Sequence, residues 1–239
     1  MKLIGVNHKD MSQVELKEML AAAVHFGHPT QKWNPKMKRY IYGVYQGIHV
    51  FDLQKTFDQL QKALSYIQLS VTEGKNILFV STKQQAASIV ETVAKKCSMP
   101  YVTHKWIGGL LTNFATVKRR IKHFQDLLEA QASGDLLKYT KKEASKFKKE
   151  LEKLEIAFGG LKNLTRMPDA LFVIDTVRDN IAIQEARKLH IPIIGIADSN
   201  ADPDDLDYPI PGNDDAVKSL KYFLAKIEDS ILNARNKKN

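Results

Sequence analysis

"IPIIGIAD", residues 191–198, is a continuous apolar run that ends in an aspartate, and "NILFVS" (76–81) and "ALFVID" (170–175) are runs of the same kind. Such runs are typical of strands covered on both faces, as in a parallel sheet. "YIYGVYQGIHVFDL" (40–53) predicts shorter, more exposed strands at the start of the same sheet. Helical patterns alternate with the runs over residues 54–73, 83–96, 178–190 and 214–234. This succession predicts a doubly wound α/β domain.

The alternation of strands and helices is interrupted once. Apolar residues recur three and four positions apart over residues 114–128 and again over 140–158. Two helices with such narrow apolar stripes bury them against each other, which predicts a coiled-coil-like helical hairpin. The predicted domains are a core of residues 1–106 and 166–239 and an inserted hairpin of residues 107–165.

Composition narrows the class of protein. The chain has 239 residues, 44% of them hydrophobic, and a formal net charge of +9. No segment approaches the roughly 18 apolar residues of a membrane span, so we expect no membrane partner. The positive charge favours an acidic partner, most often a nucleic acid. Cys97 is the only cysteine and the N-terminus fits neither a secretory signal nor a transit peptide, so a cytoplasmic location is expected.

The loop "KWNPKMKRY" (32–40) has the composition of an RNA-binding segment. Pro35 stiffens it and restrains Asn34, while Trp33 and Tyr40 offer flat faces for bases or sugars. Its cations are Lys32, Lys36, Lys38 and Arg39.

"HKWIGGLLTN" (104–113) repeats this combination. Lys105 and Trp106 precede a flexible glycine pair, and Thr112 and Asn113 follow it as hydrogen-bonding caps. Either loop alone is also compatible with a place in the core, because tryptophan is largely buried on average. Both together, in a chain of this charge, favour RNA.

The start of the predicted hairpin is strongly basic. "VKRRIKH" (117–123) places four cations within five positions, which favours contact with phosphate. They are Lys118, Arg119, Arg120 and Lys122. For the distal half of the hairpin, a solvated charged face is an equally good interpretation.

Catalytic signatures are missing from the sequence. It contains no G-x-G-x-x-G, no phosphate-binding G-x-x-x-x-G-K-[ST], no G-x-S-x-G and no H-E-x-x-H. "FVSTKQQA" places Ser81, Thr82 and Lys83 at a strand-to-helix junction, where backbone N–H groups favour an anion but where Ser and Thr also occur simply as caps. We therefore expect no enzyme and no small-molecule substrate, with a nucleotide-using enzyme on a doubly wound sheet as the alternative.

A metal site is a further hypothesis. The segment "NADPDDLDYPIPGNDD" (200–215) contains six aspartates and no basic residue, which fits a Pro-rich surface loop that ends in a helix cap. Alternatively, Asp198 at the end of a predicted strand and Asp214 approach His28, and these three residues bind zinc. No cofactor is required by any other feature of the sequence.

Eight blocks in this order resemble one known family, the small-subunit ribosomal protein S-two family of bacteria and organelles. The blocks are "HFGHPTQKWNPKM", "GIHVFDL", "STKQQA", "WIGGLLTN", "LEKLEIAFGGLKN", "MPDALFVID", "EARKLHIPIIGIADSNADPD" and "DYPIPGNDDA". The resemblance implies a three-layer flavodoxin-like α/β domain with a mainly parallel sheet and an inserted helical coiled-coil hairpin. It also implies a structural, non-catalytic constituent of the cytoplasmic small ribosomal subunit that binds ribosomal RNA and docks the neighbouring protein S-one during translation.

Transferred to this chain, the resemblance assigns RNA contact to the two loops and to the base of the hairpin. The residues are Lys32, Trp33, Asn34, Lys36, Lys38, Arg39, Lys105, Trp106, Asn113, Lys118, Arg119, Arg120 and Lys122. The acidic stretch near Asp198 and Asp202 would face a protein partner or a metal, because RNA would be repelled there. The chain departs from the family pattern at Ser81, Lys105, Ala197 and Ser199, and Lys105 lacks the planar fork with which arginine grips phosphate.

Overall fold

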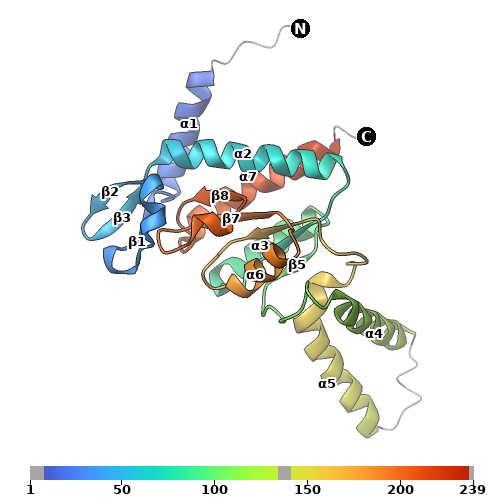
Figure 1. Cartoon of the computed structure of the whole chain (residues 1–239). Helices are drawn as coiled ribbons and strands as arrows, with labels where there is room; N and C mark the ends of the chain where they lie inside the picture. The colour runs from blue at the N-terminus through green and yellow to red at the C-terminus, as the bar shows by residue number, and fades with distance from the viewer. Residues whose placement is uncertain (1–7, 134–140, 237–239) are drawn as a thin grey trace, which may run out of the picture.

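A computed structural model describes residues 8–133 and 141–236 of the chain (Figure 1). Its centre is a five-stranded sheet in the order β5-β4-β6-β7-β8, and all neighbouring strands in it are parallel. The strands are β4 (Ile77–Val80), β5 (Tyr101–Val102), β6 (Ala170–Val173), β7 (Ile193–Ala197) and β8 (Tyr208–Pro211). The three apolar runs of the sequence form β4, β6 and β7, so the α/β prediction is confirmed.

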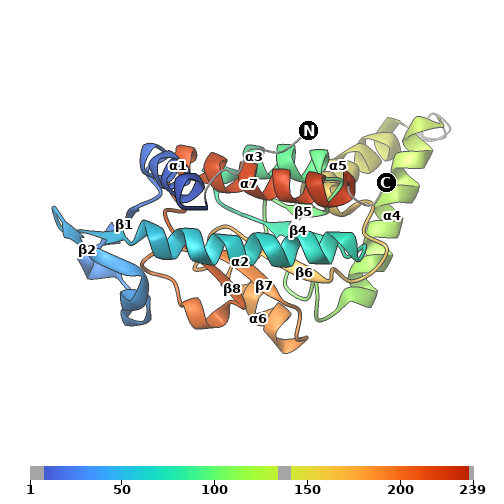
Figure 2. The ribbon, with the colours of Figure 1, turned by 90° about the horizontal axis from the view of Figure 1, so that it is seen from above.

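The two faces of this sheet are covered by different helices. Side chains alternate along a strand, so Phe79 and Phe172 point to one face, while Leu78 and Leu171 point to the other. The first face packs against α2, α3 and α7, and the second packs against α6 and the base of α4 (Figure 2). These helices are α2 (Leu53–Thr72), α3 (Gln84–Lys96), α6 (Asn180–Lys188) and α7 (Val217–Asn236). The result is the expected three-layer arrangement.

The segment 40–53 does not belong to this sheet, and the sequence-based prediction was wrong there. It forms β2 (Ile41–Tyr45) and β3 (Ile48–Phe51), which pair in an antiparallel ladder with β1 (Phe26–Pro29) in the order β1-β3-β2. Gln46 and Gly47 both have positive φ, 49° and 76°, as a tight two-residue hairpin turn requires. A turn this short returns the chain directly beside β2, so the strands pair with each other instead of joining the parallel sheet.

Further described elements are one α-helix and several short 3-10 helices. Helix α1 (His8–Ala21), which the sequence analysis missed, precedes β1. The 3-10 helices are η1 (Thr30–Lys32), η2 (Pro35–Tyr40), η4 (Gly159–Leu161) and η5 (Pro203–Asp205). Within the described residues, no helix has the length and apolar character needed to cross a membrane.

Helices α4 (Phe114–Ala132) and α5 (Lys141–Phe158) lie between β5 and β6 in the chain and project from the sheet side by side (Figure 1). Ile121 and Phe124 are buried along α4, and Leu128 of α4 and Leu151 and Leu154 of α5 are partly buried against the same cluster. The predicted apolar stripes therefore do line the contact. Coiled-coil geometry and the division into two domains remain predictions, and residues 134–140 of the predicted hairpin lie outside the described part of the chain.

Candidate functional site

The loop after β1 is held in place by hydrogen bonds of Asn34. The backbone N–H of Asn34 donates to the carbonyl oxygen of Ser199 at 2.7 Å, and the Asn34 side chain accepts from the N–H of Lys36 at 3.0 Å. Met37 and Tyr40 are buried beneath the loop. The sequence thus builds a fixed loop whose four cations are all exposed.

Two of these cations already have carboxylate partners. Lys36 Nζ lies 2.7 Å from Asp202 and 3.3 Å from Asp204, and Arg39 Nη2 lies 2.7 Å from Asp204. The hydrogen bond to Asp202 raises the pKa of Lys36 above its ordinary value. Lys32 and Lys38 form no ion pair with any described residue, which leaves them available for an anion.

The aromatic residues expected to contact RNA differ in exposure. Trp33 is 36% exposed, with its ring 4.8 Å from that of His49. Tyr40 is only 7% exposed, so the expectation that its ring offers a flat face to bases was wrong. Trp106 is equally buried, and its contact with RNA stays a prediction. The indole of Trp106 instead donates to Glu185 Oε1 at 3.0 Å, and the guanidinium of Arg39 lies over the Tyr40 ring at 5.1 Å.

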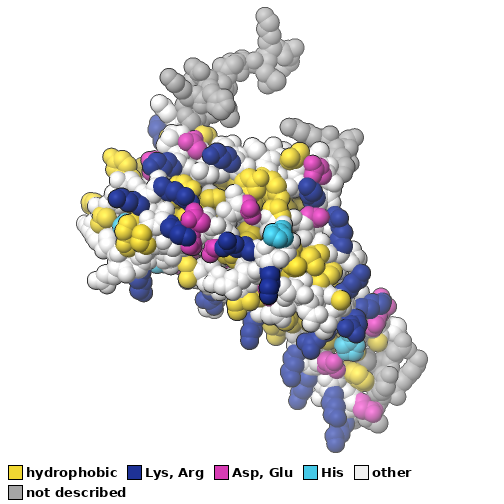
Figure 3. Space-filling view, viewed as in Figure 1, with side chains coloured by type: hydrophobic (Ala, Val, Ile, Leu, Met, Phe, Trp, Pro, Cys, Tyr) yellow, Lys and Arg dark blue, Asp and Glu magenta, His cyan; other side chains and the backbone are white. Residues whose placement is uncertain are grey.

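The base of the α4–α5 pair carries the second basic surface. Lys118, Arg119, Arg120 and Lys122 are exposed on α4, and Lys and Arg side chains gather at this end of the molecule (Figure 3). Lys122 forms an exposed pair with Asp126 at 2.8 Å. Pairs of this kind hold their members weakly.

Lys105 and Asn113 are also exposed. Asn113 occupies the N-cap position of α4, but its side chain makes no capping hydrogen bond. Figure 1 places β1–β3 at one end of the molecule and α4 and α5 at the other. The predicted RNA-binding residues therefore form two separate surfaces.

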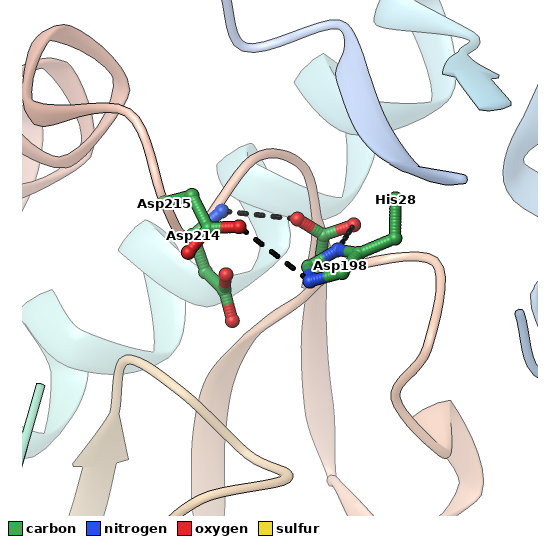
Figure 4. Close-up of side chains that lie close together, drawn as sticks. All are labelled: His28, Asp198, Asp214 and Asp215. Carbon is green, nitrogen blue, oxygen red and sulfur yellow. Dashed lines mark hydrogen bonds and ion pairs between the residues drawn. The ribbon is translucent and has the colours of Figure 1, made fainter. Parts of the chain in front are cut away.

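The predicted metal ligands do meet (Figure 4). His28 on β1 has its Nδ1 atom 2.9 Å from Asp198 Oδ1, and the backbone N–H of Asp214 donates to Asp198 Oδ2 at 3.3 Å. Asp215, which was not among the predicted metal ligands, lies 3.5 Å from His28 Nε2. One ligand atom from each of these four residues lies within 4.8 Å of the others. An imidazole nitrogen and carboxylate oxygens at this spacing are a donor set suited to zinc.

Neighbouring charges and burial change the pKa values of residues in this cluster. The hydrogen bond to Asp198 outweighs partial burial and raises the pKa of His28. Burial, together with Asp198 and Asp175, raises the pKa of Asp214 to about 7, although Lys83 opposes this change. The adjacent acid pair in "GNDD" was the signal from which Asp215 could have been identified.

The strand-to-helix junction after β4 binds the protein's own carboxylates. Lys83 is buried, and its Nζ atom lies 2.6 Å from Asp215, 2.8 Å from Asp214 and 3.3 Å from Asp175. Thr82 donates to Asp179 through its N–H at 3.0 Å and its hydroxyl at 2.8 Å. Groups that would hold a phosphate at this position are thus already used, which argues against a nucleotide site there.

Two comparisons with known proteins, one with a family profile and one with a single relative, agree with each other. The family profile described as "Ribosomal protein S2" matches residues 19–234. The small ribosomal subunit protein uS2 of Coprothermobacter proteolyticus is 47% identical over 225 residues, which cover 94% of this chain and 84% of that protein.

Proposed function

Since the chain belongs to the ribosomal protein S2 family, we propose that it binds ribosomal RNA through the two basic surfaces and docks the neighbouring protein S-one through its acidic cluster. As a family member it is a constituent of the small ribosomal subunit, located in the ribosome in the cytoplasm. It takes part in translation as a structural component, and it carries out no catalytic step.

One observation supports RNA binding most directly. Lys118, Arg119 and Arg120 are exposed along one helix, and they form no ion pair with any described residue. Cations without carboxylate partners release counterions when they bind phosphate, which is the main source of affinity for RNA. At the carboxyl ends of the sheet, in contrast, carboxylates surround Lys83 and would repel a phosphate.

A pair of triple variants tests RNA binding. Arg119→Gln, Arg120→Gln and Lys122→Gln together should weaken binding to small-subunit ribosomal RNA, and should lower the salt slope by about 0.7 to 0.9 log units for each phosphate that is no longer neutralised. The matched control, Lys142→Gln, Lys146→Gln and Lys149→Gln, removes the same charge from the distal half of the same pair of helices. Equal losses of affinity in the two variants would mean that only net charge matters and would contradict a specific surface on α4.

The acidic cluster supports the proposed docking of S-one. Asp204 and Asp215 are 48% and 56% exposed, so both carboxylates are accessible to a protein partner, although Asp204 also pairs with Lys36 and Arg39 of the basic loop. Small subunits reconstituted with Asp204→Asn and Asp215→Asn should retain less S-one than subunits with the exposed control Asp58→Asn on α2. Full retention of S-one by the double variant would rule out this surface.

Zinc binding by His28, Asp198 and Asp214 is a separate proposal. The donor set supports it, and the metal would tie β1 to the loops that follow β7 and β8. Elemental analysis of assembled subunits should find zinc that is lost on His28→Ala. Absence of zinc from wild-type subunits would exclude the site.

A further inference from the structure

Glu185 on α6 is a buried carboxylate that accepts five hydrogen bonds from one loop. It is 8% exposed. Its Oε1 atom accepts from the indole N–H of Trp106 at 3.0 Å and from the backbone N–H of Gly109 at 2.7 Å. Its Oε2 atom accepts from the backbone N–H groups of Leu111 and Thr112 at 3.0 and 3.1 Å, and from the Thr112 hydroxyl at 3.1 Å. These donors come from a stretch of seven residues.

The loop is shaped around this carboxylate. Gly109 has φ of +84°, a left-handed conformation that L side chains rarely adopt. Leu110 and Leu111, which follow Gly109 in the chain, are both buried. Without Glu185, three backbone donors and an indole would lose their acceptor in a partly buried position, which is costly. The loop therefore has one well-defined arrangement only while the carboxylate is present.

The residues held by Glu185 directly adjoin predicted RNA contacts. Trp106 follows Lys105, and Thr112 precedes Asn113, after which α4 begins at Phe114. Glu185 thus holds the chain before the glycine pair, through Trp106, and after it, through Leu111 and Thr112. The polar and basic side chains of the loop and of α4 extend from this fixed segment. A carboxylate close to an RNA-binding surface would by itself repel RNA. Here the negative charge of Glu185 is stabilised by the five hydrogen bonds that it accepts.

Hydrogen bonding also sets the charge state of this group. Burial alone would raise the pKa of Glu185, but the donors on Trp106, Thr112, Gly109 and Leu111 outweigh burial and hold its pKa below the ordinary value. The side chain is therefore ionised at neutral pH, and all its oxygen lone pairs are available as acceptors.

We propose that Glu185 is a positioning residue for RNA binding, which orders residues 106–112 so that Lys105, Asn113 and the base of α4 meet the RNA in one geometry. This inference rests on the proposed RNA-binding function. It assigns a role in binding to a residue that does not itself touch the RNA.

Glu185→Gln is the first variant to test. The glutamine amide has the size of the carboxylate but only one acceptor oxygen. Its NH2 group therefore faces loop N–H or O–H donors that have lost their acceptor. The matched control is Glu228→Gln on α7, a mostly buried glutamate paired with Lys96 at 2.9 Å. Both variants raise the net charge by one, and this change alone would favour RNA. Affinity for small-subunit ribosomal RNA, measured well below each melting temperature, should fall about tenfold for Glu185→Gln because the loop must be reordered on binding, and should not fall for Glu228→Gln.

A double-mutant cycle with Lys105→Gln separates positioning from a purely structural role. If Glu185 acts through Lys105, then Lys105→Gln weakens RNA binding by a smaller factor in the Glu185→Gln background than in the wild type. Hydrogen exchange at the amides of Gly109, Leu111 and Thr112 should be faster in Glu185→Gln. Thr112→Val, which removes a single donor, should give the same changes to a lesser degree without loss of the fold.

The outcomes distinguish this inference from the function on which it rests. A wild-type chain that does not bind the RNA would refute the proposed function and the inference together. Normal RNA affinity for Glu185→Gln, or full additivity with Lys105→Gln, would refute only the positioning role, and RNA binding by the loop and helix would stand.

Discussion

Lys83 illustrates how a side chain acquires its role from distant neighbours. Its position after a strand predicts an anion-binding junction, but its ammonium group is surrounded by three aspartates that follow β6 and β8. Although burial alone would lower the pKa of Lys83, Asp214 and Asp215 raise it above its ordinary value. Lys83 is therefore the counterion that allows these carboxylates to lie at the carboxyl edge of the sheet.

Removing this counterion should destabilise the fold. Lys83→Met leaves Asp214 and Asp175 without their cation in a buried position, and the free energy of unfolding should fall by about 3 kcal/mol or more. Urea unfolding at pH 7 measures the change. Lys95→Met, which breaks the exposed pair with Glu91, is the control and should have little effect. Similar losses of stability in the two variants would mean that the cluster around Lys83 is not a stabilising feature.

His28 should make stability depend on pH. Its pKa is raised above the ordinary value of 6.5, so the folded chain holds the proton more tightly than the unfolded chain does. The resulting stabilisation is complete below pH 6.5 and is lost as the pH rises through the folded-state pKa. In the presence of a chelator, the urea midpoint should fall as the pH rises above 6.5, and this fall should be smaller in His28→Asn. His104→Asn, at an exposed histidine, serves as the control, and an unchanged pH profile in His28→Asn would contradict this account.

At the scale of elements, the strands that the sequence predicted correctly are those with a clear local pattern of apolar residues. The runs that form β4, β6 and β7 are apolar throughout because both faces of these strands are covered. β8 was interpreted as part of a surface loop, because Pro209 and Pro211 argue against a strand. They are tolerated because β8 is at the edge of the sheet and pairs with β7 alone. β5 has only two residues and carries no periodic signal.

The return of the chain from α5 to the sheet depends on a single glycine. A Cβ atom on Gly160 would overlap the carbonyl oxygen and the ring of Tyr101 at β5. Gly160→Ala should therefore push the end of α5 away from the sheet and lower the free energy of unfolding by about 1 to 3 kcal/mol. Gly108→Ala is the matched control, because a Cβ there would meet open space. Equal urea midpoints for the two variants would show that this close approach is not needed.

The site was less predictable than the fold, because its contacts join distant segments. Exposed lysines and arginines were identified from residue type and spacing, and the structure does expose them. The burial of Trp106 depends on Glu185, which lies 79 residues away and carries no local signal of its role. The contacts of His28 with Asp198 and Asp215 likewise depend on how β1 lies against the ends of β7 and β8.

At the scale of the whole molecule, the two basic surfaces are separated by the three-layer core. One surrounds Lys32 and Lys38 near the small antiparallel sheet, and the other lies on α4 (Figures 1 and 3). The core between them is rigid because both faces of its sheet are closely packed. If both surfaces bind RNA as proposed, the core holds the two contacts at a fixed separation.

This separation predicts that the two surfaces contribute independently to RNA binding. Lys32→Gln with Lys38→Gln, and Arg119→Gln with Arg120→Gln, should each lower the salt slope for small-subunit ribosomal RNA by about 1.4 to 1.8 log units if every cation meets one phosphate. Distant sites that share no partner have additive effects, so the fourfold variant should lose the sum of the two free energies of binding. Filter binding over a series of salt concentrations measures both quantities. A fourfold variant that binds no more weakly than one of the double variants would mean that RNA engages only one end of the molecule.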